Sequence, residues 1–188
     1  MNRIKSWWRF KGRYFLKDFK QGIRNLWRWF PTIWKDRDWD AYFIYEILRV
    51  KLENQAYYIG NKDRHVEAKR DAERMLLCAR LIKIQQDDLY HMEYLDYIKE
   101  SYEFVATDDT NKWYSMESKL LNDDLDTYFA LYPKQYKRAL SGKLNRFQRP
   151  AFDRDRQLIA MEIALDNQER SRKLLFKIMS QHIERWWD

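Results

Sequence analysis

The sequence contains few of the residues that build sheets and tight turns. Of its 188 residues only four are glycine, three are proline, three are valine and four are threonine. Valine and threonine are β-branched residues that favour strands, so their scarcity argues against a many-stranded sheet. Glu, Lys, Arg, Leu, Gln and Ala fill the chain instead, and these residues favour helix. The composition therefore predicts an all-α fold.

A single cysteine, Cys78, excludes an intramolecular disulfide. It shares an apolar helical stripe with Ala72, Leu76 and Ala79, which predicts a small buried core residue rather than a reactive thiol. The first ten residues lack the apolar segment of a signal peptide. The longest uncharged run, residues 54–61, is far shorter than the ~18 residues that a membrane-spanning helix needs. We therefore expect a soluble protein in the cytoplasm.

No motif in the chain carries a recognisable catalytic chemistry. The glycines are scattered, so no glycine-rich phosphate loop is present, and no Ser or Cys stands in a recognisable nucleophile elbow. These observations predict a protein that is not an enzyme, with no catalytic residues and no cofactor.

Two groups of acidic residues are the best candidates for a metal site, and their pattern is wrong for one. Carboxylate-bridged di-iron sites use two Glu-x-x-His pairs on paired helices, whereas this chain has a single Asp-x-x-His. Solvated helix faces and i,i+4 ion pairs explain the groups better, and we predict no metal site. The residues concerned are Asp88, His91 and Glu93 in one group and Glu162, Asp166 and Glu169 in the other.

Charge and tryptophan are concentrated at the N-terminal end. Residues 1–40 hold eleven Lys/Arg and four Asp/Glu, a net charge of +7, and the remaining 25 basic and 25 acidic residues cancel. The same forty residues contain six of the nine tryptophans. We therefore divide the chain into a basic aromatic block, residues 1–40, and a helical body, residues 41–188, within one domain.

The block contains a predicted amphipathic helix from Arg13 to Phe30. At 100° per residue, Phe15, Phe19, Ile23, Leu26 and Phe30 lie on one side of it. A row of cations lies on the opposite side, and Trp27 and Trp29 lie on the borders. Pro31 should end the helix, because proline disfavours the helical conformation of the preceding residue. The cations are Arg13, Lys17, Lys20, Arg24 and Arg28.

The body is predicted to form four or five helices packed as a bundle. Residues 35–40 supply N-caps for a helix from Ala41 to Ile59, which Gly60 stops. Eight consecutive polar residues, 166–173, lie in the middle of the last helix and should either project beyond the core or meet another polar surface. The other predicted helices start near Asp63 and continue to about Val105, run through Trp113, Met116, Leu120 and Tyr128, span residues 133–142, and extend from Asp153 to about Trp186.

Residues 22–40, GIRNLWRWFPTIWKDRDWD, resemble a segment of small, uncharacterised accessory proteins of tailed bacteriophages. The resemblance continues from Lys51 to about Leu81, and it returns in the terminal Trp186, Trp187 and Asp188. It implies a phage origin and an accessory role in the cytoplasm of the infected host cell. It implies no established activity.

The block suggests a binding function for the chain. Lys and Arg neutralise phosphate, and tryptophan offers a face on which a base can stack. Our leading hypothesis is a non-catalytic protein that binds a small anionic nucleotide or a nucleic acid, and one form of this hypothesis is a sponge for host immune signalling nucleotides. Its phosphate ligands would be the five cations, and its stacking residues would be Trp27, Trp29, Trp34 and Trp39.

Three other uses of the block stay open. It is also consistent with a solvated amphipathic helix, with an interface for a host protein, or with docking on a membrane surface. Membrane docking requires the face of Phe15, Phe19 and Ile23 to be uncovered. Aromatic residues are enriched at interfaces, so a homo-oligomer is also expected. Eight tyrosines at helical spacings could otherwise build a core, namely Tyr42, Tyr45, Tyr57, Tyr58, Tyr90, Tyr94, Tyr97 and Tyr102.

Overall fold

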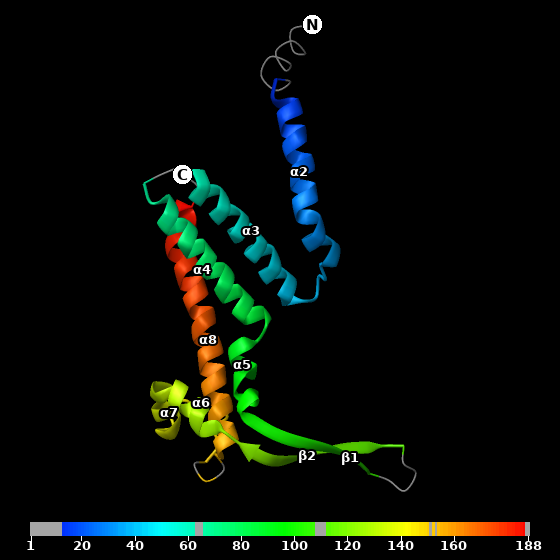
Figure 1. The fold of residues 1–188 in the computed structure, drawn as a ribbon, viewed down its shortest axis with the longest axis vertical. Coiled ribbons are helices and arrows are strands. Elements are labelled where there is room, and N and C mark those ends of the chain that lie inside the picture. Colours follow the sequence, from blue (N-terminus) through cyan, green and yellow to red (C-terminus); the bar gives the residue numbers. More distant parts are fainter. Residues whose placement is uncertain (1–12, 63–65, 108–111, 151, 153, 187–188) are drawn as a thin grey trace. The chain divides into compact units, whose positions relative to one another are not determined.

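The structure is a computed structural model that describes residues 13–62, 66–107, 112–150, 152 and 154–186, without the side chains of Arg13 and Lys62. It is mostly helical, and the described residues also form one antiparallel sheet of two strands (Figure 1). The all-α prediction therefore needs correction for residues 98–123. The chain divides into two compact units, residues 1–51 and 52–188.

The first unit holds α2, Arg13–Lys35, and the first half of α3, Ala41–Lys62. α2 continues through Pro31, so the predicted end at Phe30 was wrong. Proline has no N–H and removes one hydrogen bond to the residue four positions earlier. That residue is Trp27, which is largely exposed, so water can solvate the freed carbonyl group without ending the helix.

α3 begins where the sequence predicts and runs further than expected. The Asp40 carboxylate accepts a hydrogen bond from the backbone N–H of Tyr42 at 2.8 Å, which is the expected N-cap. The helix continues to Lys62 rather than stopping at Gly60. A Cβ at Gly60 would lie 3.2 Å from the Cβ of Ala72, so this glycine allows close helix packing instead of ending the helix.

The second unit is a helical bundle around α8, Arg156–His182, which is followed by the short helix η4, Ile183–Arg185. α4, Ala68–Gln86, contacts α8. On the predicted apolar stripe of α4, Ala72 and Ala79 are buried, whereas Leu76 is exposed; Met75 and Ile82 of the same helix are also buried.

Cys78 is fully buried in α4, which confirms its prediction as a core residue. Burial raises the pKa of the Cys78 thiol to about 11. A thiol with this pKa is protonated near neutral pH, and the protonated form is a poor nucleophile.

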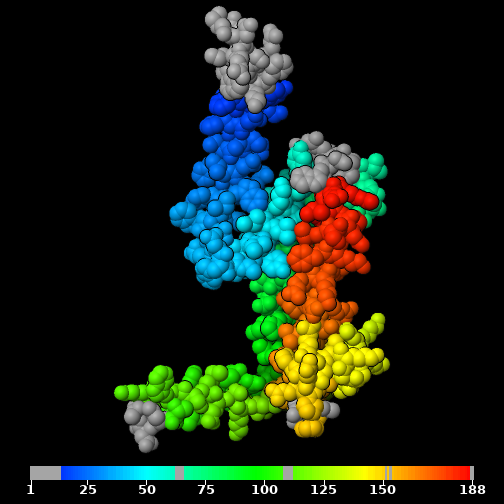
Figure 2. All heavy atoms as spheres, turned by 180° about the vertical axis from the view of Figure 1, so that it is seen from behind, coloured from blue at the N-terminus to red at the C-terminus, as the bar shows by residue number. Residues whose placement is uncertain are grey.

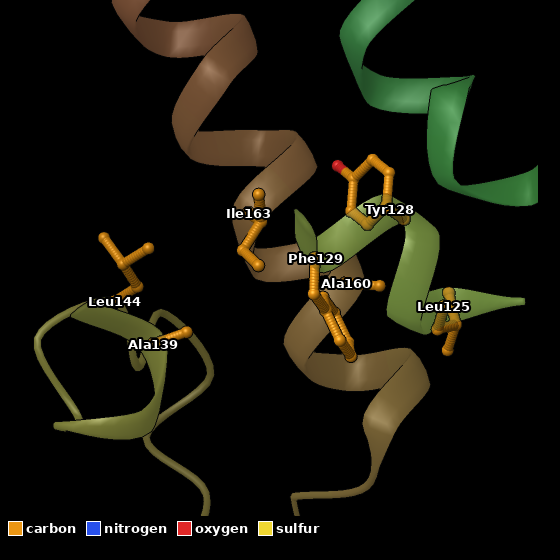
Figure 3. Packing of buried hydrophobic residues seen from close by; sticks show 7 residues of the cluster. All are labelled: Leu125, Tyr128, Phe129, Ala139, Leu144, Ala160 and Ile163. Atoms are coloured by element: carbon orange, nitrogen blue, oxygen red, sulfur yellow. The ribbon is translucent and has the colours of Figure 1, made fainter. Parts of the chain in front are cut away.

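A second group of buried residues lies where α6, Leu125–Leu131, and α7, Pro133–Leu140, pack against the start of α8. Figure 3 shows Tyr128 and Phe129 of α6 beside Ala160 and Ile163 of α8. Of the eight tyrosines that could build a core, Tyr94 and Tyr97 are half-buried and pack against this cluster, whereas its fully buried tyrosine is Tyr128. The residues of this core are Leu125, Tyr128, Phe129, Ala139, Leu144, Ala160 and Ile163.

α7 confirms the predicted short helix. It ends in a turn at Gly142, whose φ of 74° is left-handed. The backbone N–H groups of Gly142 and Lys143 donate to the carbonyl groups of Ala139 and Arg138, each at 2.9 Å. This pair of hydrogen bonds is the Schellman motif, which favours glycine at the left-handed position.

The polar middle of α8 meets other polar surfaces, which was one of its two predicted outcomes. Asp166 accepts a hydrogen bond from Arg138 of α7 at 3.0 Å, and Asn167 accepts one from Gln135 at 3.2 Å. Asp166, Asn167 and Ser171 are buried. Polar pairing therefore holds α8 against its neighbours along this stretch.

A β-hairpin replaces parts of two predicted helices. After α4 come the short helices α5, Leu89–Glu93, and η2, Tyr94–Tyr97, and then the strands β1, Ile98–Ala106, and β2, Tyr114–Asp123. Side chains of a strand point alternately to its two faces, so Tyr102 and Phe104 share one face of β1. Met116 of β2 lies opposite Phe104, which places the apolar residues of both strands on the same face. The hairpin extends away from the helices of its unit (Figure 1).

Candidate functional site

The apolar face of α2 is uncovered. Phe15, Phe19, Ile23, Leu26 and Phe30 are between 42% and 66% exposed. Phe15 and Phe19 stack on each other with ring centroids 6.2 Å apart, but this contact lies within the helix. Because large apolar side chains normally bury their surface, a row of this length indicates a binding surface.

A different side of α2 is the covered one. Thr32 is buried and Trp29 is half-buried. At 100° per residue, Trp29 lies about 80° and Thr32 about 140° from Phe19, at the centre of the apolar face. The buried positions of α2 therefore lie to one side of its apolar face, which stays exposed.

The predicted cations are displayed on one exposed strip of α2. Lys17, Lys20, Arg24 and Arg28 are exposed, and none of them forms an ion pair with another described residue. The side chain of Arg13 lies outside the described part of the structure. From Lys17 to Arg28 the strip extends about 16 Å at the 1.5 Å rise of a helix. It is a convex surface on a single helix, open to solvent along its length.

The predicted stacking tryptophans do not share one environment. Trp27 and Trp34 are more than 70% exposed and lie at the edge of the apolar face, next to Lys20 on the helical wheel. Trp39 is exposed in the turn between α2 and α3, whereas Trp29 is half-buried. Trp27 and Trp34 are thus the two that adjoin both the apolar face and the cations.

The apolar face contains a shallow open hollow. Ile23, Leu26, Trp27 and Phe30 line it, and its surface is almost wholly apolar. Phe30 also contacts Trp34, with ring centroids 5.3 Å apart. The hollow can contact an apolar group, and no charged group lies at its base. It therefore suits an acyl chain better than a phosphate.

The acidic residues of α8 are ion-pair partners. Glu162 is fully buried and accepts a hydrogen bond from Arg154. Glu169 pairs with Arg146 and with Lys173, the latter at 2.6 Å in an i,i+4 pair. The Lys173 ammonium, followed by the Arg146 guanidinium, lowers the pKa of Glu169 to about 2.

The acidic residues of the other group have hydrogen-bond partners. Glu93 accepts a hydrogen bond from the Tyr132 hydroxyl at 2.6 Å, and Asp88 accepts one from Gln168 at 3.4 Å. Burial, followed by the hydrogen bond to Glu93, raises the pKa of Tyr132. Across the described parts of the chain, no three His, Cys, Asp or Glu residues are grouped so that they could hold a metal ion.

Two features bear on the membrane hypothesis. Membrane docking requires the face of Phe15, Phe19 and Ile23 to be uncovered, and all three side chains are exposed. Within the described residues, no helix combines the length and the apolar character needed to cross a bilayer.

The sequence reasoning missed one exposed surface, the hairpin. Phe104 is 71% exposed and Met116 is 61% exposed, and both lie on the same face of the two strands. The sequence contained a signal for this strand, since apolar and polar residues alternate within residues 98–106 over a length typical of a strand. The same residues also fit a helical spacing when taken with their neighbours, and that fit favoured the wrong prediction.

Comparison with protein-family models, with curated proteins and with solved structures gives no significant match. The resemblance of residues 22–40 to phage accessory proteins therefore stays an expectation.

Proposed function

We propose that the protein is a peripheral membrane-binding protein whose helix α2 lies in the surface of an anionic bilayer. The observation that carries this proposal is the uncovered apolar face of α2, which runs beside an uncovered strip of cations. A helix with Lys and Arg on one face and Phe, Leu and Trp on another is typical of the membrane interface. Such a helix needs no partner within its own chain.

The charge of α2 matches an anionic surface. The helix contains six basic residues and one acidic residue, Asp18. Each Lys or Arg near an anionic leaflet contributes about 1 kcal/mol. The long stems of Lys20 and Arg24 allow their charged ends to reach the phosphates while the adjacent apolar face is inserted. Attraction of this kind weakens as salt screens it.

The tryptophans favour a lipid surface over the groove of a partner protein. Trp27 and Trp34 lie where the apolar face meets the cations, which corresponds to the headgroup level of an inserted helix. A helix that docks in a protein groove presents a narrow stripe at i, i+3, i+4 and i+7. The apolar face of α2 is broader, since it spans about 80° from Phe15 to Ile23 and the exposed Leu16 extends it by a further 20° beyond Ile23.

The expected location agrees with this proposal. In the cytoplasm of an infected host cell the available surface is the inner leaflet, which carries the anionic lipids. Binding there would concentrate residues 52–188 at the membrane without any catalytic step.

Vesicle co-flotation tests the proposal. The protein should float with vesicles of mixed phosphatidylcholine and phosphatidylserine and bind phosphatidylcholine alone much more weakly. The variant Lys17→Glu/Lys20→Glu/Arg24→Glu should lose binding to the anionic vesicles while its circular dichroism spectrum is unchanged. Full binding by this variant, or equal binding to both lipids, would contradict the proposal.

Binding of a nucleic-acid backbone or an anionic nucleotide is the second candidate. The unpaired strip of Lys17, Lys20, Arg24 and Arg28 supports it, because exposed cations neutralise phosphate. Both candidates need the cations, and only membrane binding needs the apolar face. The variant Ile23→Asp therefore separates them, since it should abolish vesicle binding and leave binding of a short oligonucleotide nearly intact.

A further inference from the structure

The hairpin presents an uncovered sheet. In the described residues β1 pairs only with β2, and both faces of the ribbon beyond its base are exposed (Figure 2, green). Phe104, Met116 and Leu120 are at least 45% exposed. An isolated two-stranded ribbon is marginally stable in water, and a third or fourth strand stabilises it. The free edges of this hairpin are where another strand can add.

The register shows which backbone groups the outer edge of β2 offers. The N–H of Thr107 donates to the carbonyl of Trp113 at 2.9 Å, so these two residues form a hydrogen-bonded pair. Hydrogen-bonded and non-hydrogen-bonded pairs alternate along an antiparallel ladder. Phe104 and Met116 therefore form a non-hydrogen-bonded pair within the hairpin. It follows that the N–H and C=O groups of Met116, Ser118 and Leu120 point outward.

The sequence around Ser118 is self-complementary. Glu117 and Lys119 flank this serine, and Met116 and Leu120 flank them in turn. If a second β2 runs antiparallel with Ser118 opposite Ser118, Glu117 lies opposite Lys119 of the second copy on both sides of the centre. Met116 then lies opposite Leu120 of the second copy. Opposite charges and apolar pairs across strands are both stabilising.

This centre also agrees with the backbone geometry and with the length of the strand. Ser118 has outward-pointing N–H and C=O groups, so a pair of Ser118 residues can exchange two hydrogen bonds. Glu117 and Lys119 of the second copy then form a non-hydrogen-bonded pair, in which side chains approach most closely. Ser118 is near the middle of β2, Tyr114–Asp123, so the helices of the two copies lie at opposite ends of the shared sheet.

A charge conflict within the hairpin supports the same register. Glu103 and Glu117 lie directly opposite each other, and like charges in this position are destabilising. No ion pair within the described residues offsets either carboxylate. Pairing about Ser118 would bring Lys119 of the second copy beside Glu117. The second copy would thereby supply the positive charge that this row lacks.

We infer that β2 pairs with β2 of a second copy about a two-fold axis at Ser118, so that two hairpins form one four-stranded antiparallel sheet. The pairing makes about six backbone hydrogen bonds between Met116 and Leu120. The contact is limited to one strand of each copy, so we expect a weak dimer with a dissociation constant in the micromolar range. This inference does not depend on membrane binding. Two copies of α2 in one dimer would strengthen any such binding through avidity.

Charge reversal and charge exchange test the register. The full-length wild-type protein should show a monomer–dimer equilibrium in sedimentation velocity over a dilution series. Lys119→Glu places Glu opposite Glu twice, and should raise the dimer dissociation constant about tenfold or more. Glu117→Lys/Lys119→Glu restores opposite charges at both positions and should restore the dimer. The exchanged variant is the matched control, because it keeps the composition of the wild type.

A cysteine cross-link tests the axis itself. In a hydrogen-bonded antiparallel pair the Cα atoms are about 5.5 Å apart, which suits a disulfide. Ser118→Cys should therefore form a covalent dimer under mild oxidation. Ser101→Cys, on the exposed surface of β1, is the control and should not, because two intervening strands separate the two copies of residue 101.

Each outcome bears directly on the inference. It is overturned if the wild type is monomeric throughout the dilution series, or if Lys119→Glu remains as dimeric as the wild type. Failure of the exchanged variant to recover, with an unchanged circular dichroism spectrum, also overturns it. Efficient cross-linking through residue 101 in place of residue 118 would mean that β1 forms the interface. The vesicle assay compares variants of α2 only, whereas these experiments change β1 or β2, so the failure of one proposal can be told from the failure of the other.

Discussion

The two helices α2 and α8 show opposite relations between sequence pattern and burial. α2 separates its apolar residues from its cations, yet Phe19 and Leu26 are more than half exposed. α8 carries eight consecutive polar residues in its middle, yet Asp166 and Ser171 are buried there. The difference teaches that an amphipathic pattern identifies a surface and does not identify what covers it. For α8 the partner is within the chain, and for α2 we propose that it is outside.

Matched leucines should give the largest difference between the two helices. Leu175 of α8 is fully buried, whereas Leu26 of α2 is 66% exposed. Leu175→Ala should lower the free energy of unfolding by about 2–5 kcal/mol, because it leaves a cavity. Leu26→Ala should change it by less than about 0.5 kcal/mol. Urea denaturation followed by circular dichroism measures both, and equal losses would show that the apolar face of α2 is covered.

A buried and an exposed aspartate should differ less in their contribution to the free energy of unfolding than the two leucines do. Asp166 of α8 is buried beside the half-exposed Arg138, and Asp18 of α2 is exposed. Asp166→Ala should lower the free energy of unfolding by about 1 kcal/mol, because it removes a charged hydrogen bond that water replaces only in part. Asp18→Ala should leave stability nearly unchanged. The comparison fails if Asp166→Ala costs no more than Asp18→Ala in the same denaturation experiment.

The pH dependence contributed by Glu169 should be the smallest effect. Lys173 and Arg146 lower its pKa from 4.5 to about 2. The folded state therefore holds the proton of the Glu169 carboxyl group less tightly than the unfolded state does. The stabilisation that the Glu169 carboxylate contributes is fully present above about pH 4.5 and is lost as the pH falls toward 2. Glu169→Gln should therefore show a shallower loss of stability over that interval than the wild type. Identical slopes for the two proteins would mean that the ion pairs contribute nothing.

Local patterns in the sequence predicted the parts of the fold that depend on neighbouring residues. The faces of α2, the start of α3 and the short helix α7 follow from helical spacing and capping within a few residues. The hairpin did not follow, because Trp113, Met116 and Leu120 together fit a helical spacing, while Met116 and Leu120 also fit an alternating one. Which of two periods prevails there depends on pairing with residues 98–106, a contact that no local pattern contains.

The environment of the candidate site could be predicted only in part. The sequence located the apolar face and the cations of α2 and placed Trp27 at their border. It gave no means to decide whether the apolar face is covered, because coverage depends on residues distant in the chain. The buried partners of Glu162 and Asp166 were hidden for the same reason, since Arg154 and Arg138 reach them only in the folded chain.

The most direct test of the external partner of α2 is vesicle co-flotation with one added charge on either side of the helix. Phe19→Asp places a carboxylate in the apolar face, and Gln21→Asp places the same carboxylate about 160° away. If the apolar face inserts into an anionic bilayer, Phe19→Asp should no longer float with phosphatidylserine-containing vesicles, while Gln21→Asp should float nearly as well as the wild type. Equal flotation of the two variants would contradict the account.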